Sequence, residues 1–143
     1  MGKQKIVAML CVKNEDWIIR DTLTSLSNFV DEIVVVDDGS TDDTVRIVKE
    51  FRKVTGLHVN RNPKCWKEVT NCNIALRMAK ERDADWIVYI GADEMFEYKM
   101  KDRIHELVNA SRNVGSYSFR KLWLWNSKDF YRADRPEKFQ SVN

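Results

Sequence analysis

One stretch decides how this chain folds: IVVVDDGSTD, residues 33–42. It opens with four β-branched residues in a row, which favour a strand that is buried on both faces. Two carboxylates follow the strand, and then come a glycine suited to a turn with positive φ and residues that often cap helices. A buried strand that ends in a polar turn before a helix indicates one repeat of an α/β fold.

The same alternation continues on both sides of this stretch. Strands are predicted over Ile6 to Val12, Glu32 to Asp37, Leu57 to Asn60, Trp86 to Ile90 and Ser116 to Trp125. Helices between them are predicted from apolar residues three or four positions apart. Their inward stripes are Ile19, Leu23, Leu26 and Val30; Val45, Val48 and Phe51; Val69, Cys72, Leu76 and Ala79; and Met100, Ile104, Leu107 and Val108. This order predicts a doubly wound α/β fold, with a mostly parallel sheet and helices on both faces.

Length and composition exclude several classes of protein. A chain of 143 residues suits one domain spanning residues 1–143, and 43% hydrophobic with 32% charged residues is ordinary globular usage. The net charge of +2 is too small to indicate a nucleic-acid partner. The first apolar run, Ile6 to Val12, is too short for a membrane span or a signal peptide. Three cysteines without a C-x-x-C pair indicate free thiols, and we therefore expect a cytoplasmic protein.

Polar clusters follow three of the predicted strands. They are Lys13 to Asp16, Asp37 to Asp43 and Gly91 to Glu94. Ligands of such sheets bind beyond the carboxyl ends of the strands, where these clusters should meet. Carboxylates gathered there repel one another unless a cation joins them. Mg²⁺ or Mn²⁺ is the natural candidate, because these hard cations take oxygen ligands and share them with phosphates.

Some of these acidic residues have simpler structural uses. Asp42 and Asp43 lie in the first turn of a predicted helix, where acids are favourable, and Ser40 or Thr41 suits its cap. Two adjacent acids directly after a buried strand exceed what a cap needs. We therefore single out Asp38, and with it Asp93 after the strand that ends near Ile90.

At this point the sequence resembles a known family. Residues 33–42 are similar to the signature of family 2 glycosyltransferases, which have the Rossmann-like GT-A fold. Val12-Lys13-Asn14-Glu15 resembles the end of the family's first strand, and Asn73-Ile74-Ala75-Leu76 resembles its third helix. Asp85 to Glu94 resembles its metal-binding strand end. The resemblance extends from about Ile6 to about Tyr131.

The resemblance assigns roles in donor binding. It implies that Asp38 reads the edge of the nucleobase, where a carboxylate suits the imide N–H of uracil. Val12 and Asn14 would line the pocket for base and ribose, beside Asp37. Lys67 is the nearest match to a basic residue that faces the donor phosphates. The implied partner is a nucleotide-diphosphate sugar, with a UDP-sugar favoured.

The resemblance also assigns the metal and shows two departures. Asp93 matches the acid that coordinates Mn²⁺ or Mg²⁺ on the donor diphosphate. Gly91 stands where the first acid of the usual Asp-x-Asp motif would be, and Cys72 stands where the family often has arginine. Metal binding is therefore expected to depend on Asp93.

Family members normally continue well beyond the equivalent of Asn143, so the resemblance implies truncation on the C-terminal side. The acceptor-side portion and the catalytic base would lie outside this chain, and the sequence identifies no catalytic residue. Asp134 and Glu137 are interpreted as charges of a tail. A surface left by the absent portion could be covered by a second copy, as a homodimer. The basic C-terminal end leaves open a peripheral contact with a membrane surface.

We therefore predict a glycosyltransferase-type domain that binds a nucleotide-diphosphate sugar with a divalent metal. The glycosyl group would pass to a hydroxyl of an unknown saccharide or lipid-linked acceptor. The main alternative is a non-catalytic nucleotide-binding or interaction module on a truncated glycosyltransferase scaffold. A receiver domain would carry its acidic pair after the first strand, where Lys13-Asn14 stand. A nucleotidyltransferase would need a glycine-rich basic loop at that same place.

Overall fold

The computed structural model describes residues 3–61, 67–110 and 114–122. The chain divides into two compact units, Met1–Ser111 and Arg112–Asn143. Helices and strands of the described residues all belong to the first unit. They are, in chain order, β1 (Ile6–Val12), α1 (Ile19–Ser27), β2 (Glu32–Asp37), α2 (Thr44–Lys49), β3 (Val54–Val59), α3 (Glu68–Lys80), β4 (Trp86–Tyr89) and α4 (Met100–Asn109).

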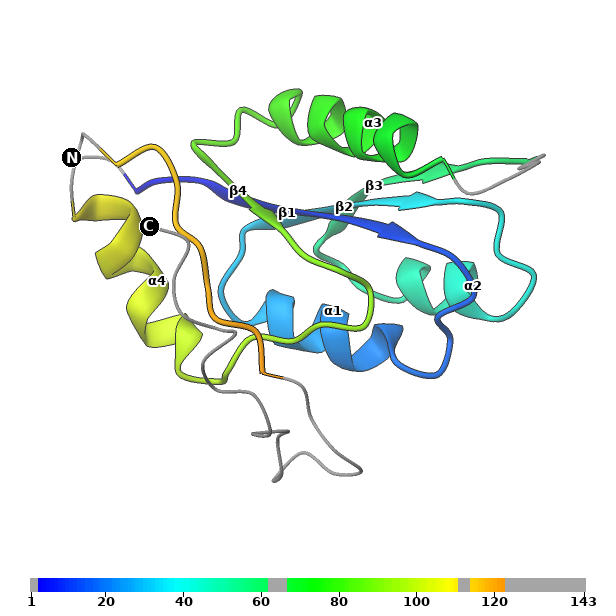
Figure 1. Cartoon of the computed structure of the whole chain (residues 1–143), viewed down its shortest axis with the longest axis horizontal. Coiled ribbons are helices and arrows are strands. Elements are labelled where there is room, and N and C mark those ends of the chain that lie inside the picture. Colours follow the sequence, from blue (N-terminus) through cyan, green and yellow to red (C-terminus); the bar gives the residue numbers. More distant parts are fainter. Residues whose placement is uncertain (1–2, 62–66, 111–113, 123–143) are drawn as a thin grey trace. The chain divides into compact units, whose positions relative to one another are not determined.

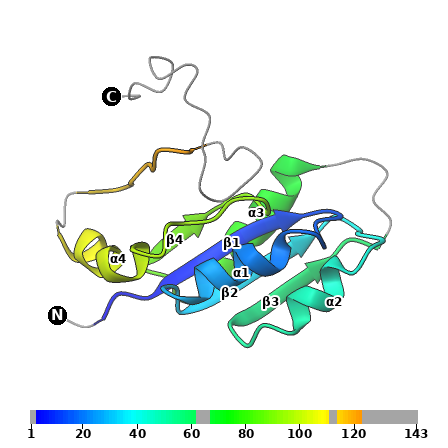
Figure 2. The ribbon, with the colours of Figure 1, turned by 90° about the horizontal axis from the view of Figure 1, so that it is seen from below.

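The four strands form one sheet in the order β3-β2-β1-β4. Every pairing is parallel, with Ala8 opposite Ile33 on one side of β1 and opposite Val88 on the other. Helix α3 covers one face of this sheet, and α1 and α2 cover the other (Figure 1). The strands can be followed side by side in the view from below (Figure 2). The predicted doubly wound α/β fold is confirmed.

The alternation of side chains along β1 divides the core into two clusters. Ile6 and Leu10 pack with the apolar stripe of α1, whereas Val7 and Met9 pack with α3 on the other face. The predicted stripe of α1 is confirmed, because its members are 0–1% exposed. Central strands buried on both faces explain why β1 and β2 read as continuous apolar runs.

Helix α3 buries a face that is rotated from the predicted one but shares Ala79 with it. Its buried residues are Asn71, Ala75 and Ala79, while the predicted Val69 is 76% exposed. Alanines have short side chains, which suit a helix that lies close to a sheet. Because the first residue of this buried stripe is polar, a search for apolar periodicity selects the neighbouring face instead.

The structure also differs from the sequence predictions at the third and the fifth predicted strands. Strand β3 begins at Val54 rather than Leu57 and contains Gly56, which was expected to end the preceding helix. A Cβ at Gly56 would lie 2.4 Å from the guanidinium of Arg82, so any larger residue would have to displace that side chain. The predicted fifth strand over Ser116 to Trp125 is not formed at residues 116–122, and residues 123–125 lie outside the described residues. Alternating aromatic residues suit a strand, but a strand also needs a partner for its backbone.

Helix α2 is shorter than its sequence pattern suggests. It buries Thr44, Ile47 and Val48, and Phe51 lies beyond its last turn. The side chain of Asp42, rather than Ser40 or Thr41, accepts the backbone N–H of Thr44 at 3.0 Å. The prediction that Asp42 and Asp43 lie in the first turn is wrong, because the helix begins at Thr44 and Asp43 is its N-cap residue, but Asp42 does have a structural use in the turn before the helix.

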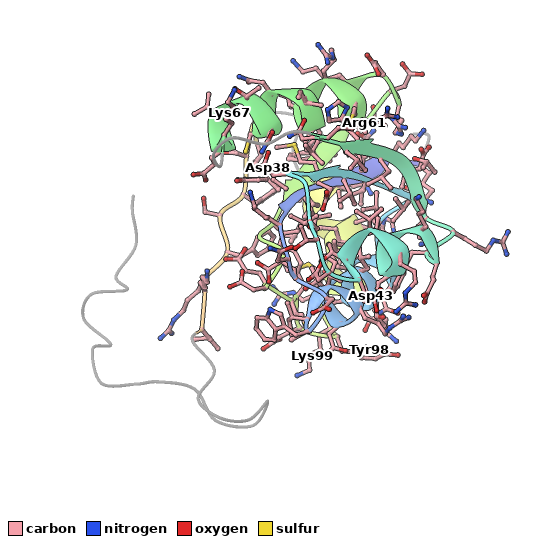
Figure 3. All side chains as sticks on the ribbon, turned by 90° about the vertical axis from the view of Figure 1, so that its right-hand side faces the viewer. Asp38, Asp43, Arg61, Lys67, Tyr98 and Lys99 are labelled. Atoms are coloured by element: carbon pink, nitrogen blue, oxygen red, sulfur yellow. The ribbon has the colours of Figure 1, made fainter. Side chains whose placement is uncertain are left out.

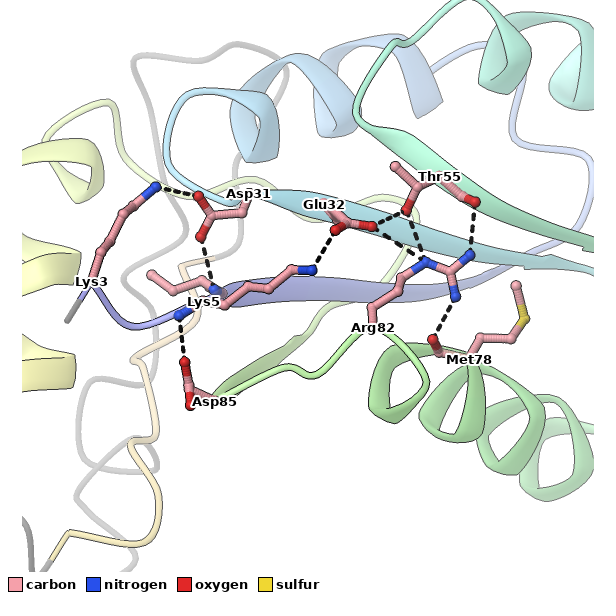
Figure 4. Close-up of polar contacts among 9 residues, drawn as sticks. Lys3, Lys5, Asp31, Glu32, Thr55, Met78, Arg82 and Asp85 are labelled. Carbon is pink, nitrogen blue, oxygen red and sulfur yellow. Dashed lines mark hydrogen bonds and ion pairs between the residues drawn. The ribbon is translucent and has the colours of Figure 1, made fainter.

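Arg82 ties the amino ends of the strands to α3 (Figure 4). Its guanidinium donates to the backbone carbonyls of Thr55 at 2.7 Å and Met78 at 2.6 Å. Its Nε lies 3.5 Å from a carboxylate oxygen of Glu32, which also pairs with Lys5 at 2.6 Å. These contacts lie at the opposite end of the sheet from the polar strand ends.

Replacing Arg82 with alanine is expected to destabilise the fold without changing ligand affinity. The substitution removes the donors to the part-buried carbonyl of Met78 and the exposed carbonyl of Thr55, which lowers the free energy of unfolding by roughly 0.5–1.5 kcal/mol. Urea denaturation measures this loss, with the exposed Lys80→Ala on the same helix as the matched control. An unchanged midpoint for Arg82→Ala would show that these contacts contribute little.

Candidate functional site

The turn after β2 is built around Asp37. Its carboxylate is fully buried, and Oδ2 accepts the backbone N–H groups of Gly39 at 3.0 Å and Ser40 at 2.9 Å. Gly39 has φ 76°, which glycine adopts without strain. The carboxylate of Asp37, predicted to bind nucleotide, is thus used to shape the turn.

The loop after β1 is fastened to this turn by Asn14. Its Oδ1 accepts the N–H of Thr41 at 2.8 Å, and its own N–H donates to Ser40 Oγ at 2.9 Å. Asn14 has φ 54°, a conformation that asparagine tolerates better than most residues. Val12 contributes through its backbone, because its side chain lies in the core and its carbonyl accepts the N–H of Asp38 at 2.9 Å.

Asp38 is buried, with 1% of its surface exposed. Asn60 Nδ2 donates to its Oδ1 at 2.8 Å, and Lys13 Nζ lies 3.7 Å from its Oδ2. Burial alone would raise the pKa of this carboxyl. The amides of Asn71 and Asn60, the ammonium of Lys13 and the backbone N–H of Lys67 outweigh burial and hold the pKa below its usual value. The side chain is therefore an ionised acceptor at neutral pH.

An open pocket of about 560 Å³ lies at the carboxyl ends of β1, β2 and β3. It is lined by Lys13, Asn14, Gly39, Ser40, Thr41, Val59, Asn60 and Arg61. Two of these side chains are cations, and most of the others offer hydroxyl, amide or backbone groups. Such a lining suits an anionic ligand that also carries hydroxyl groups.

Among these lining residues the sequence predicted only Asn14 as a binding residue. Lys13 was part of a predicted strand-end cluster without a role of its own, and Asn60 and Arg61 were not singled out. Asn60 and Arg61 directly follow β3, at the same edge of the sheet as the predicted clusters. The rule that ligands bind beyond the strand ends would have found them. They were overlooked because the third strand was a weak prediction and no acidic cluster marks its end.

Lys67 begins the approach to α3 and has an exposed side chain. Figure 3 shows Lys67 at the start of α3 and Arg61 at the end of β3, both at the edge of the molecule where Asp38 lies. The backbone N–H of Lys67 helps to hold the Asp38 carboxylate in its charged form. The predicted contact between the Lys67 side chain and phosphate stays a prediction.

The segment after β4 carries Asp93 on an exposed turn. The N–H of Gly91 donates to Glu94 Oε2 at 2.8 Å, and the buried Thr22 hydroxyl donates to the carbonyl of Ala92 at 2.7 Å. A Cβ at Gly91 would lie 3.1 Å from Asp93 Oδ1 and 3.2 Å from Glu94 Oε2. The glycine therefore leaves room for two carboxylates to approach the same point.

The ends of β1 and β4 are electrostatically linked through Glu15. Burial raises the pKa of Glu15, and the negative charges of Asp93 and Asp42 raise it further, against a hydrogen bond from Trp17 that lowers it. Charges that raise the pKa of a carboxyl are close enough to repel its ionised form. A cation at this edge would relieve that repulsion.

The carboxylates suit a metal that is shared with a ligand. Within residues 3–61, 67–110 and 114–122, no three His, Cys, Asp or Glu side chains are gathered closely enough to hold an ion by themselves. Mg²⁺-like cations are commonly bound by one or two carboxylates together with substrate phosphates. Asp93, with Glu94 beside it, fits that arrangement.

Cys11 and Cys72 are free, half-buried thiols whose sulfur atoms lie 3.8 Å apart. Cys72 Sγ also lies 3.4 Å from the hydroxyl of Tyr89. Burial, and next the neighbouring Cys72, raise the pKa of the Cys11 thiol to about 12, so it is protonated at neutral pH. The prediction of free thiols is confirmed for these two, and Cys65 lies outside the described residues.

Comparison with protein families settles the classification. The model of glycosyl transferase family 2 matches residues 8–142. The chain belongs to this family. The resemblance found in the sequence is thus confirmed, and the parallel sheet described above is the Rossmann-like core of a family 2 domain.

Two curated relatives are named as glycosyltransferases. The chain is 33% identical over 142 residues to an uncharacterized glycosyltransferase of Rickettsia prowazekii, with 98% of the chain and 44% of the relative covered. It is 36% identical over 136 residues to an uncharacterized glycosyltransferase of Rickettsia typhi, with 94% and 42% covered. The chain therefore spans less than half the length of these relatives.

Solved structures share the fold. TarS 1-349 of S. aureus in complex with UDP is 26% identical, with a TM-score of 0.58 over 71% of this chain and 31% of that one. The same protein in complex with UDP-GlcNAc is 19% identical, with a TM-score of 0.61 over 80% of this chain and 37% of that one. In the part of the family 2 chain that the structure describes, no helix is long and apolar enough to cross a membrane.

Proposed function

We propose that this family 2 domain binds the nucleoside diphosphate of a nucleotide sugar, with a UDP-sugar favoured, at the carboxyl edge of its sheet. The observation that carries the proposal is the pocket at the ends of β1, β2 and β3, which has cationic lining residues and an ionised Asp38 beside it. The structural likeness to a UDP complex of TarS at 26% identity supports the choice of nucleotide.

The pocket offers groups suited to each part of a nucleotide. Asp38 would accept a hydrogen bond from the base, and the side chains of Asn14 and Ser40 lie where ribose hydroxyls could be bound. Lys13 and Arg61 bring positive charge that attracts the diphosphate. Asp37 and the Val12 backbone would act indirectly, by shaping the turns that carry these groups.

The metal half of the proposal rests on the segment after β4. Asp93, with Glu94 beside it, would hold Mn²⁺ or Mg²⁺ between the protein and the diphosphate. When bound, such an ion stabilises the negative charge that develops on the leaving diphosphate. The glycosyl group would then pass to a hydroxyl acceptor in the whole glycosyltransferase. A saccharide or lipid-linked acceptor and a homodimer stay predictions from the sequence.

A panel of nucleotides in a thermal-shift assay tests the proposal. Ligand that binds only the folded state raises the free energy of unfolding by mass action, by about 2.7 kcal/mol at a hundredfold excess over Kd, and the melting temperature rises with it. We expect UDP with Mn²⁺ to give the largest shift, ahead of CDP, ADP and GDP, and UDP without metal to give a smaller one. The proposal fails if no nucleoside diphosphate raises the melting temperature in the presence of Mn²⁺ or of Mg²⁺.

A further inference from the structure

Two thiols meet between the sheet and α3. Cys11 lies on β1 among the apolar residues that face α3, and Cys72 lies in the second turn of that helix. Their sulfur atoms are 3.8 Å apart, although the two residues are 61 positions apart in the sequence. A disulfide bond is about 2.0 Å long, so an approach of about 1.8 Å would join the two sulfurs. The proposed function uses neither thiol.

The two thiols differ in how readily they react. A thiolate, rather than a thiol, attacks an oxidant. Burial, and next the neighbouring Cys72, raise the pKa of the Cys11 thiol to about 12, which makes Cys11 the less reactive of the two. Cys72 Sγ lies 3.4 Å from the hydroxyl of Tyr89, a residue of the edge strand β4 that is 57% exposed. A small oxidant that enters from the solvent beside Tyr89 therefore meets the sulfur of Cys72 first.

We propose that Cys11 and Cys72 are a peroxide-sensitive pair that forms a disulfide between β1 and α3. The sulfur of Cys72 attacks one oxygen of hydrogen peroxide, the O–O bond breaks, and a sulfenic acid and water form. The sulfur of Cys11 then attacks the sulfenic sulfur, and the hydroxyl group leaves with the Cys11 proton as water. The two thiols lose two electrons in all, and the peroxide is reduced to two waters. Contact between the sulfurs favours the second step, because the partner thiol is already in place.

The disulfide would lie next to the proposed nucleotide pocket. Asn71 directly precedes Cys72, and its amide helps to hold the carboxylate of Asp38. Val12 directly follows Cys11, and its carbonyl accepts the N–H of Asp38 at 2.9 Å. Because protein interiors are closely packed, drawing the two sulfurs together also shifts these neighbours. We therefore expect the disulfide to weaken the binding of UDP, and this part of the inference rests on the proposed function.

Mass spectrometry of proteolytic peptides tests the disulfide. The chain has a third cysteine, so the test uses both the unaltered chain and Cys65→Ser, which retains only the facing pair. Each is treated with hydrogen peroxide, and the remaining thiols are then blocked with iodoacetamide. We expect the peptides that contain Cys11 and Cys72 to be linked in both, and dithiothreitol to separate them. Free thiols, a link only between two chains, or a link from Cys65 in place of this pair would overturn the proposal.

Dimedone, which labels sulfenic acids, tests which thiol reacts first. In the double variant Cys11→Ser, Cys65→Ser the sulfenic acid on Cys72 has no partner thiol, so dimedone should label it. In Cys72→Ser, Cys65→Ser the remaining Cys11 should be labelled much more slowly at the same peroxide concentration. Labelling of Cys11 at an equal or greater rate would contradict the order of attack.

Calorimetric titration of UDP with Mg²⁺ tests the effect on the pocket. Oxidation of Cys65→Ser should lower its affinity for UDP roughly threefold or more, the equivalent of one lost hydrogen bond, and dithiothreitol should restore the affinity. The matched control is Cys72→Ser, Cys65→Ser, whose affinity for UDP should not respond to peroxide.

These measurements separate the inference from the proposed function. If the oxidised chain carries the disulfide and binds UDP as tightly as the reduced chain does, the effect on the pocket is wrong and the proposed function stands. If the reduced chain does not bind UDP, the proposed function is wrong, and the linked peptides still decide whether the disulfide forms.

Discussion

Asp38→Ala is expected to lower the affinity for UDP about tenfold to a hundredfold and to leave the affinity for pyrophosphate with metal unchanged. A hydrogen bond to a charged group contributes about 1.5–3 kcal/mol, and only the base is expected to contact this carboxylate. Calorimetric titration of both ligands measures the difference. Asp43→Ala is the matched control, because Asp43 is an exposed acid beyond the same turn that pairs with Arg46 at 2.8 Å.

A structural role for Asp38 gives a different result. Its carboxylate lies beside the start of α3, near the backbone N–H of Lys67, so the substitution is also expected to lower the melting temperature. If destabilisation of the fold were the only effect of the substitution, the affinities for UDP and for pyrophosphate would fall by the same factor. Such equal weakening would contradict the assignment of Asp38 to the base.

Asp93→Asn is expected to remove most of the metal dependence of UDP binding. The substitution replaces the carboxylate proposed to hold the cation and should lower metal affinity by at least about tenfold. Because Asp93 is exposed, the melting temperature without ligand should change little. Titrating Mn²⁺ at fixed UDP concentration measures the effect.

Glu94→Gln serves as the comparison for the metal site. Glu94 accepts the N–H of Gly91 at 2.8 Å, a contact that glutamine can reproduce with its carbonyl oxygen. We therefore expect a smaller loss of metal dependence than for Asp93→Asn. If Asp93→Asn bound UDP with unchanged dependence on Mn²⁺, the metal would have to be held elsewhere.

The central strands and first helix of the fold were predictable because burial dominates their sequences. Strands β1 and β2 are covered on both faces, so β1 and residues 33–36 of β2 are apolar throughout and the bounds of both strands could be predicted. The face assigned to helix α3 was right at Ala79 and wrong at Val69, because Asn71 occupies a buried position where apolar periodicity predicts no polar residue. Its burial depends on Asn60, which is distant in sequence, and no local pattern reveals that contact.

The candidate site was only partly predictable, for a related reason. The strand-end rule brought Asn14, Asp38 and Asp93 to one edge of the sheet, and Asp38 was singled out, but the adjacent Asp37 was also assigned to the nucleotide pocket. The structure separates these two acids, since Asp37 bonds to its own turn and Asp38 bonds to Asn60. Two adjacent acids are alike as residue types. Tertiary contacts decide which of them faces a ligand, and these contacts cannot be inferred from the local sequence.

The most direct test of nucleotide binding at this edge is a titration of the ¹⁵N-labelled chain with UDP and Mg²⁺, followed by amide chemical shifts. We predict the largest shifts at the backbone amides of Gly39, Thr41 and Asn60, with further shifts at Gly91 when the metal is present. The amides around Arg82, at the opposite end of the sheet, should stay unchanged. Largest shifts around Arg82, or no shifts at UDP concentrations that raise the melting temperature, would contradict the account.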